Sequence, residues 1–317
     1  MVFPMQTGIP YGAPSRACGG PAAPGPAAVC RRRQGSAGGA VCQGGFPRMG
    51  TVNTLVITGY GTNSHLETAH TARLAGADRA DVVHFSDLVA AKVHLDDYHF
   101  LIFPGGFLDG DDLGAAQTAV MRWRYLEDAA GVPLREQLDR FLEAGKLVLG
   151  ICNGFQLLVK LGVLPALDGH RFERQVSLGH NDSARFEDRW VRLAPNAQSP
   201  CVFTKGLPPL AMPVRHGEGK LVPRDADCLS RLQKENLIAL QYADPKTGLP
   251  TQEYPYNPNG SALAIAGLTD PTGRVLGLMP HPEAFHHVTN HPGWTRGELD
   301  PPGTLLFVNA VRYLREL

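Results

Sequence analysis

The stretch VLGICNGFQ, residues 148–156, decides the fold, because an apolar run leads directly into Gly-x-Cys-x-Gly and helix-forming residues follow. This order predicts a strand, a tight turn and a helix, the nucleophile elbow of many hydrolases with sulfur in place of oxygen. Gly150 and Gly154 leave room for a strained turn. The turn would raise Cys152 beside a helix N-terminus, where the helix dipole favours a thiolate. The N–H of Asn153 would then point toward a developing oxyanion.

The alternative interpretation of Cys152 is a small buried side chain at the end of a strand. Two flanking glycines and the abrupt change from a strand pattern to a helix pattern favour the nucleophile.

Around this stretch, apolar runs alternate with helical patterns. Strands are predicted over 52–58, 80–85, 99–106 and 147–152, and helices over 63–77, 134–146 and 153–164. Strands that alternate with helices predict an α/β fold: an open, mostly parallel, flavodoxin-like sheet with helices on both faces. In such a sheet, ligands bind beyond the carboxyl ends of the strands.

The second half of the chain is less regular. Strands are predicted over 189–194, 237–243, 263–269 and 274–280, and a last helix over 304–317. The turn sequences DPKTG and DPTG are expected to separate the strands of two hairpins. Residues 51–317 are therefore expected to form one domain.

The first 50 residues have a different composition, rich in Gly, Pro, Ala and Arg, with few large apolar side chains. Such a segment buries too little surface to offset its chain entropy, and we expect it to be disordered. Two other interpretations are an organelle transit peptide and a translation start at Met49.

Composition narrows the classes of function. The chain of 317 residues has 30 Lys+Arg and 30 Asp+Glu, so no general attraction to nucleic acid or to an anionic membrane is expected. Six cysteines without a CxxC pair argue against a disulfide framework or a structural zinc site. No apolar run approaches the roughly 20 residues that span a bilayer. The expected compartment is the cytosol.

A second glycine-rich turn follows the strand predicted over 99–106. In FLIFPGGFLDGDD, two glycines let the backbone approach a ligand. We expect the Gly106 N–H to act beside the Asn153 N–H as the second oxyanion donor. An ordinary turn after a strand is the alternative.

A cysteine nucleophile needs a base, and His281 follows the apolar run in RVLGLMPHPEAF, residues 274–285. In an extended chain, residues i and i+2 project to the same face, and Pro280 and Pro282 are expected to hold this segment extended. Glu283 would then fix the imidazole tautomer while His281 meets the cysteine.

Two other roles for histidines stay open at this point. PVRHGEGK, residues 213–220, contains a rival pair, His216 and Glu218, but carries two glycines and does not follow a long apolar strand. A metal site would draw on His281, His286, His287 and His291. Their spacing matches no tetrahedral pattern, and no metal is expected.

Together these motifs resemble the class I glutamine amidotransferases. GICNGFQLL, NDSARFEDRW, HGEGK, YPYNPNGS and GLMPHPE are similar, in this order, to the glutaminase subunits of phosphoribosylformylglycinamidine synthase. The resemblance covers roughly residues 52–317, and five ordered motifs make it specific. The loop TGYGTNSHLETA (58–69) and the long loop after Pro-Gly-Gly depart from the family pattern.

The resemblance implies that Cys152, His281 and Glu283 hydrolyse glutamine through a γ-glutamyl thioester. It also implies that Gln156 helps to hold the substrate, although this side chain could instead cap its own helix. Phe107 and His216 are further candidates for substrate contact.

The resemblance also implies partners. The ammonia would pass to an ATP-dependent large subunit, with a small bridging subunit as a further partner. No cofactor is expected in this chain, because the large subunit would use the ATP and Mg²⁺.

Two other functions compete with this one. The first is a stand-alone γ-glutamyl hydrolase or cysteine peptidase with the same elbow. The second is a non-catalytic regulator of amidotransferase type, a class that typically lacks the Cys or the His; both are present here.

Overall fold

The structure is a computed structural model that describes residues 50–297 and 300–317. Three predictions concern the N-terminal segment outside this range: that it is disordered, that it is a transit peptide, and that translation starts at Met49. The domain boundary at residue 51 stays a prediction.

The strands are β1 (Asn53–Thr58), β2 (Arg79–His84), β3 (Phe100–Phe103), β4 (Leu147–Ile151), β5 (Val176–His180), β6 (Glu187–Pro195), β7 (Leu210–His216), β8 (Glu218–Pro223), β9 (Ile238–Ala243), β10 (Ile265–Thr269) and β11 (Val275–Leu278). The helices are α1 (His65–Leu74), α2 (Phe85–Val89), α3 (Gln117–Tyr125), α4 (Leu134–Glu143), α5 (Asn153–Leu161), α6 (Ala226–Lys234) and α7 (Thr304–Glu316).

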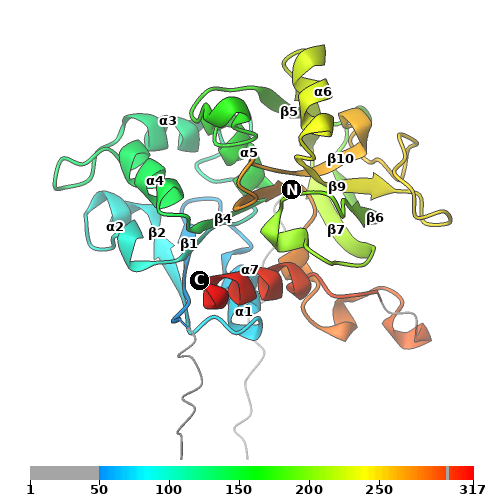
Figure 1. The fold of residues 1–317 in the computed structure, drawn as a ribbon, viewed down its shortest axis with the longest axis horizontal. Coiled ribbons are helices and arrows are strands. Elements are labelled where there is room, and N and C mark those ends of the chain that lie inside the picture. Colours follow the sequence, from blue (N-terminus) through cyan, green and yellow to red (C-terminus); the bar gives the residue numbers. More distant parts are fainter. Residues whose placement is uncertain (1–49, 298–299) are drawn as a thin grey trace, which may run out of the picture. The chain divides into compact units, whose positions relative to one another are not determined.

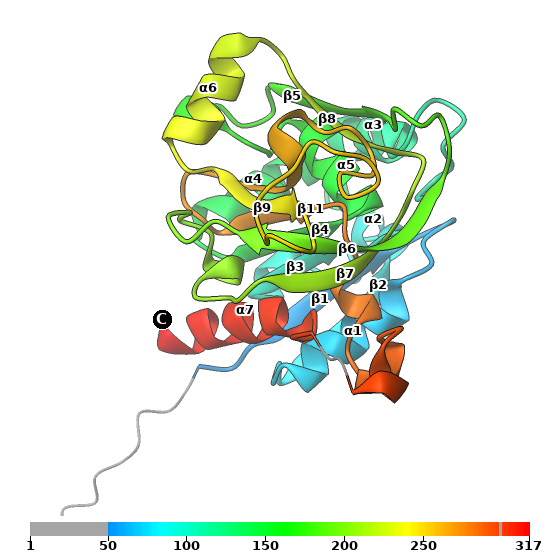
Figure 2. The same ribbon diagram turned by 90° about the vertical axis from the view of Figure 1, so that its right-hand side faces the viewer.

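A nine-stranded sheet has the order β2-β1-β3-β4-β11-β10-β9-β6-β7. The first five of these strands pair in parallel, in the 2-1-3-4-5 arrangement of flavodoxin-like folds, and the other four pair antiparallel. Figures 1 and 2 show α1 and α7 on one face of the parallel half and α3, α4 and α5 on the other. The predicted fold class is confirmed.

The centre of the parallel half forms because β3 and β4 are apolar on both faces. Every residue of β3 and β4 is buried, as expected where helices cover a sheet on both sides. Beneath α3, the Trp123 ring packs edge-on against Phe85 and Phe103, with ring centroids 5.5 and 5.4 Å away. Such aromatic contacts fix how the helix layer lies on the sheet.

The antiparallel half differs in part from the predictions. The turn DPTG does join a hairpin, between β10 and β11. The turn DPKTG does not join two strands, because β9 is followed only by an isolated bridge from Ala243 to Pro250. The helices α2, α3 and α6 and the strands β5, β7 and β8 were not predicted. In β7, Pro213 interrupts the strand pattern of the sequence. The proline is tolerated there because β7 is an edge strand of the sheet.

The order of the strands brings the three predicted motifs together. β4 lies between β3 and β11, with Ile151 opposite Leu278 and Gly150 opposite Phe103. The parallel direction places the loop after β3, the elbow after β4 and the segment after β11 at one edge of the sheet. Residues far apart in the sequence therefore meet around Cys152.

Candidate active site

The elbow at Cys152 is strained in the way that the sequence predicts. Cys152 itself has φ 50° and ψ −103°, and its N–H donates a 2.8 Å hydrogen bond to the Leu278 carbonyl. A Cβ on Gly154 would lie 1.9 Å from the Phe103 carbonyl oxygen. A Cβ on Gly150 would lie 2.7 Å from the Gly154 carbonyl oxygen, so both glycines provide space for the turn. A non-glycine residue held at positive φ is a conformation that tends to occur at functional sites.

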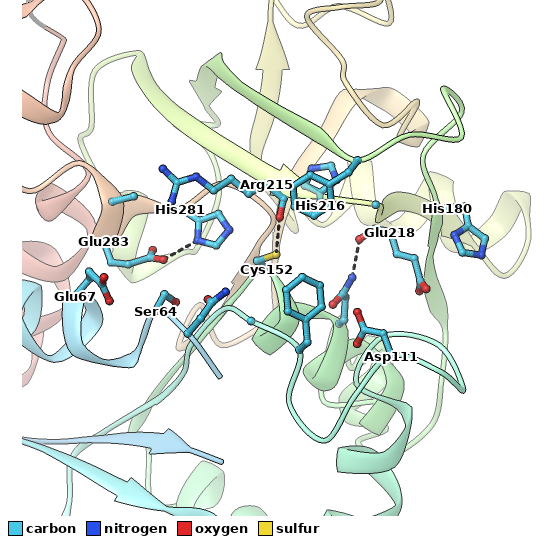
Figure 3. A pocket seen from close by; sticks show the side chains of 17 residues that line it. Ser64, Glu67, Asp111, Cys152, His180, Arg215, His216, Glu218, His281 and Glu283 are labelled. Carbon is cyan, nitrogen blue, oxygen red and sulfur yellow. Dashed lines mark hydrogen bonds and ion pairs between the residues drawn. The ribbon is translucent and has the colours of Figure 1, made fainter. Parts of the chain in front are cut away.

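The thiol of Cys152 lies at the N-terminus of α5 and is 6% exposed. Its Sγ is 3.6 Å from the carbonyl oxygen of Arg215, at the end of β7. Cys152 and His281 line one pocket, and Figure 3 shows the imidazole on the side of the thiol opposite to Glu218. The structure therefore brings the predicted nucleophile and base together.

The pair of His281 and Glu283 is buried, and the His281 Nδ1 donates to Glu283 Oε1 at 2.6 Å. One part of the prediction is wrong, because the segment is not extended. Pro282–Ala284 forms a 3₁₀ helix directly after His281, and the Ala284 N–H donates to the His281 carbonyl. Proline suits the first position of a helix, and this tight turn brings the two side chains together.

The charge on His281 follows from its neighbours. Burial of the ring lowers the pKa of His281. The Glu283 carboxylate and then the Cys152 sulfur raise this pKa by more than burial lowers it, so that it reaches about 10. The imidazole is therefore protonated at neutral pH. A charged imidazole beside Cys152 can act as a general acid toward a group bound there.

The loop after β3 carries the predicted second oxyanion donor. Gly106 has φ +135°, a region that favours glycine, and it lines the pocket with Cys152. The Gly105 N–H donates to Ser64 Oγ at 2.9 Å, and the Phe107 N–H donates to the Gly61 carbonyl at 2.8 Å. The two residues next to Gly106 in the chain thus both have hydrogen-bonded N–H groups. The N–H of Gly106 itself has no partner among the residues that the structure describes.

Asn153 and Gln156 form a hydrogen-bonded group on α5. The Asn153 Nδ2 donates to Gln156 Oε1 at 3.1 Å, and the Asn153 Oδ1 accepts from the Leu108 N–H. The Gln156 Nε2 donates to the Glu218 carbonyl at 2.6 Å. As the first residue of its helix, Asn153 has a backbone N–H without a helical acceptor. Gln156 lines the pocket, where a substrate can reach it.

His216 lies in the same pocket but does not pair with Glu218. The Asn181 amide donates to two carbonyls, so its Oδ1 accepts from His216 Nδ1 at 3.1 Å. Burial and the nearby His281 lower the pKa of His216 to about 3, so this ring is neutral. The expectation that HGEGK follows no apolar strand is wrong, because His216 ends β7, whose residues Leu210–Val214 are all buried.

The pocket has a volume of about 530 Å³. Its lining includes the half-exposed Phe107, as predicted, and also Ser64, Asp111 and Arg215, which were not predicted. Each of these three lies in an irregular segment or on an edge strand. Only the position of Asp111 after Pro-Gly-Gly could have pointed to it, since glycine-rich loops after strands are common binding sites.

The four histidines of the metal interpretation have separate partners. His286 Nδ1 bonds to the Glu283 carbonyl, His287 Nδ1 to Thr289 and His291 Nε2 to Asp300. Within residues 50–297 and 300–317, no group of three or more His, Cys, Asp or Glu side chains could hold a metal ion. In the same range, no helix has the length and apolar character that crossing a bilayer requires.

A cysteine elbow, a buried His-Glu pair and a glycine-rich loop at one edge of a flavodoxin-like sheet form the kind of site that the resemblance to class I glutamine amidotransferases predicts. Comparison with known proteins agrees. Residues 51–314 match the CobB/CobQ-like glutamine amidotransferase domain.

Named relatives narrow the class. Phosphoribosylformylglycinamidine synthase subunit PurQ of Dehalococcoides mccartyi is 40% identical over 273 residues, which cover 85% of this chain and 100% of the relative. The subunit of the same name from Methanococcus maripaludis strain C7 is 38% identical, with 83% and 97% covered. The solved structure of PurLQS from Thermotoga maritima superposes with a TM-score of 0.61 at 25% identity, over 83% of this chain and 99% of that one. This chain belongs to the PurQ family.

Proposed function

We propose that this chain is the glutaminase subunit of a phosphoribosylformylglycinamidine synthase. It hydrolyses glutamine to glutamate and ammonia, and the ammonia serves the amidation of formylglycinamide ribonucleotide in purine biosynthesis. Membership of the PurQ family supports this assignment. The observation that carries the chemistry is the 2.6 Å bond from His281 to Glu283 beside the strained Cys152.

In the first half of the reaction, the Cys152 thiolate attacks the carboxamide carbon of glutamine. The C=O π electrons move onto oxygen, and the N–H groups of Gly106 and Asn153 stabilise this oxyanion. The protonated His281 gives its proton to the carboxamide nitrogen, the C–N bond breaks, and ammonia leaves. A γ-glutamyl thioester remains on Cys152.

In the second half, the neutral His281 takes a proton from water as the water oxygen attacks the thioester carbon. The C–S bond breaks, the thiolate returns and glutamate departs. Throughout, Glu283 holds the imidazole in one orientation and stabilises its charged form.

We propose the ATP-dependent large subunit as the partner that receives the ammonia, with a small bridging subunit as a further member of the complex. ATP and Mg²⁺ act in that large subunit, and this chain uses no cofactor of its own. We also propose the cytosol as the compartment. The name of the Thermotoga maritima assembly, PurLQS, supports a complex of this kind.

Cys152→Ala in the reconstituted complex tests the assignment. Synthesis driven by glutamine should disappear, while synthesis driven by added ammonium should continue at the wild-type rate. A glutamine-mimicking electrophile, 6-diazo-5-oxonorleucine, should label Cys152 in the wild type, as read by peptide mass spectrometry. Glutamine-driven synthesis by Cys152→Ala would overturn the nucleophile assignment. Full glutaminase activity of the isolated chain would favour a stand-alone hydrolase.

A further inference from the structure

Two motifs of the sequence have no role in the reaction above, NDSARFEDRW (181–190) and YPYNPNGS (254–261). Each contains a buried asparagine: Asn181 is 3% exposed and Asn259 is 0% exposed. Buried amides are found where both their N–H and their C=O groups have hydrogen-bond partners. The partners of these two side chains lie in the segment where β7 ends and β8 begins.

This crossing segment, residues 215–219, leads from one sheet to another. β7 is an edge strand of the nine-stranded sheet, and β8 pairs with β5 in a two-stranded sheet (Figure 2). The Arg215 carbonyl oxygen lies 3.6 Å from Cys152 Sγ. The Glu218 carbonyl accepts from Gln156 Nε2 at 2.6 Å. Because the ladder of β7 ends within this segment, groups outside the ladders must help to fix the direction of its carbonyls.

Asn181 holds the first part of the crossing segment. Its Nδ2 donates to the His216 carbonyl at 2.7 Å, and its Oδ1 accepts from the ring of the same histidine at 3.1 Å. Its backbone N–H donates to the Gly217 carbonyl at 2.9 Å. One asparagine therefore fixes both the main chain and the side chain of the residue that follows Arg215.

Asn259 holds the other end of the crossing segment. Its Nδ2 donates to the Gly219 carbonyl at 2.9 Å and to the Tyr242 hydroxyl at 3.1 Å. Its Oδ1 accepts from the N–H of Ser261 at 3.1 Å and from the hydroxyl of Ser261 at 2.7 Å, which fixes the orientation of the amide. The Asn259 carbonyl accepts from the Asp182 N–H at 3.3 Å, so the two motifs are joined.

The carbonyl groups of the crossing segment are thus divided between two sides. Those of His216, Gly217 and Gly219 accept from the two asparagines. Those of Arg215 and Glu218 face the groups of the active site. The packing is close, since a Cβ on Gly219 would lie 2.8 Å from two atoms of the His216 ring.

We propose that Asn181 and Asn259 are positioning residues of the glutaminase. They fix the crossing segment so that the Arg215 carbonyl meets the nucleophile and the Glu218 carbonyl holds Gln156. Both asparagines lie behind the residues that line the pocket, so they act through the main chain and not by contact with glutamine. The inference rests on the proposed function.

Asn259→Ala tests the inference in the complex with the ATP-dependent partner. The Gly219 carbonyl loses its amide donor, and the neighbouring Glu218 carbonyl no longer holds Gln156 in place. KM for glutamine should rise about tenfold or more, because a misplacement of about 1 Å can cost about 100-fold. A general loss of stability would lower the active fraction, and with it kcat, but not change KM. Synthesis driven by ammonium should continue at the wild-type rate.

Asn181→Ala should lower kcat/KM by a similar factor. Because both side chains hold one segment, the double variant should lose less than the product of the two factors. Losses that multiply in full would contradict a shared segment. If Asn259→Ala does not fold, Ser261→Ala is the milder change, since it removes the hydroxyl that orients the Asn259 amide. It should raise KM by about threefold or more.

Asn309→Ala is the matched control. The Asn309 amide also donates to two carbonyl groups, those of Phe203 at 3.0 Å and Lys205 at 2.9 Å, but it lies on α7. This variant should lose stability in urea and keep the wild-type KM. An unchanged KM in Asn259→Ala, or an equal rise in Asn309→Ala, would overturn the inference while the proposed function stood. Absence of glutamine-driven synthesis by the wild-type complex would contradict the proposed function itself.

Discussion

His281 Nδ1 lies 2.6 Å from Glu283 Oε1, and both side chains are buried at the edge of the sheet that carries Cys152. A buried carboxylate in contact with an imidazole does two things. It fixes the tautomer, so that Nε2 faces the substrate, and it stabilises the imidazolium that protonates the leaving nitrogen.

Removing the charge of Glu283 tests this relationship. Glu283→Gln keeps the size of the side chain but can hold the wrong tautomer, so kcat for glutamine should fall by roughly 10²- to 10⁴-fold. Stopped-time assays of glutamate release give the rate. Ammonium-driven synthesis by the same complex is the control and should be unaffected. A loss of less than about threefold in kcat would show that Glu283 does not orient His281.

The pH profile should reflect the raised pKa of His281, about 10. The reaction needs the imidazolium, so kcat should stay level between about pH 7 and 9 and fall as the pH rises through about 10. Because the Glu283 carboxylate raises this pKa, the fall in Glu283→Gln should begin at lower pH. Steady-state measurements of kcat across this pH range test the prediction. If kcat fell at the same pH in the wild type and in Glu283→Gln, the explanation would be wrong.

Ser64 should matter for catalysis although it touches no reacting atom. Its hydroxyl accepts from the Gly105 N–H at 2.9 Å and so fixes the loop that presents Gly106. Ser64→Ala leaves that N–H without its partner, which costs about 1–3 kcal/mol where it is buried. We expect kcat to fall about tenfold with little change in KM. Ser64→Thr keeps the hydroxyl and should recover most of the rate, whereas equal loss in both variants would exclude this role.

Gly154→Ala should destabilise the fold, because the added Cβ would lie 1.9 Å from the Phe103 carbonyl oxygen. Relieving this overlap requires a backbone shift between α5 and β3, at a cost of about 1–3 kcal/mol or more in the free energy of unfolding. Urea denaturation measures it. At Gly179 the nearest atom to an added Cβ is 4.0 Å away, so Gly179→Ala should change stability by less than about 0.5 kcal/mol. Similar values for the two variants would contradict the packing argument.

The sequence predicted most of the parallel half of the sheet. Most of its strands are continuous apolar runs, and Gly76 at positive φ follows the end of α1, so local preferences agree with the tertiary fold there. Predictions were weaker for the antiparallel half. There, strands such as β7 contain proline and charged residues, because an edge strand tolerates both.

The sequence by itself determined the chemistry that depends on neighbours in the chain: the elbow at Cys152, the glycines that give it space, and the nearness of His281 to Glu283. The tertiary structure alone decided which groups share a pocket with them. Ser64 reaches Gly105 across 41 residues, and Glu218 reaches Ala115 across 103. The physical reason is that strand order sets these contacts, and strand order depends on how the whole sheet packs, which no local pattern encodes.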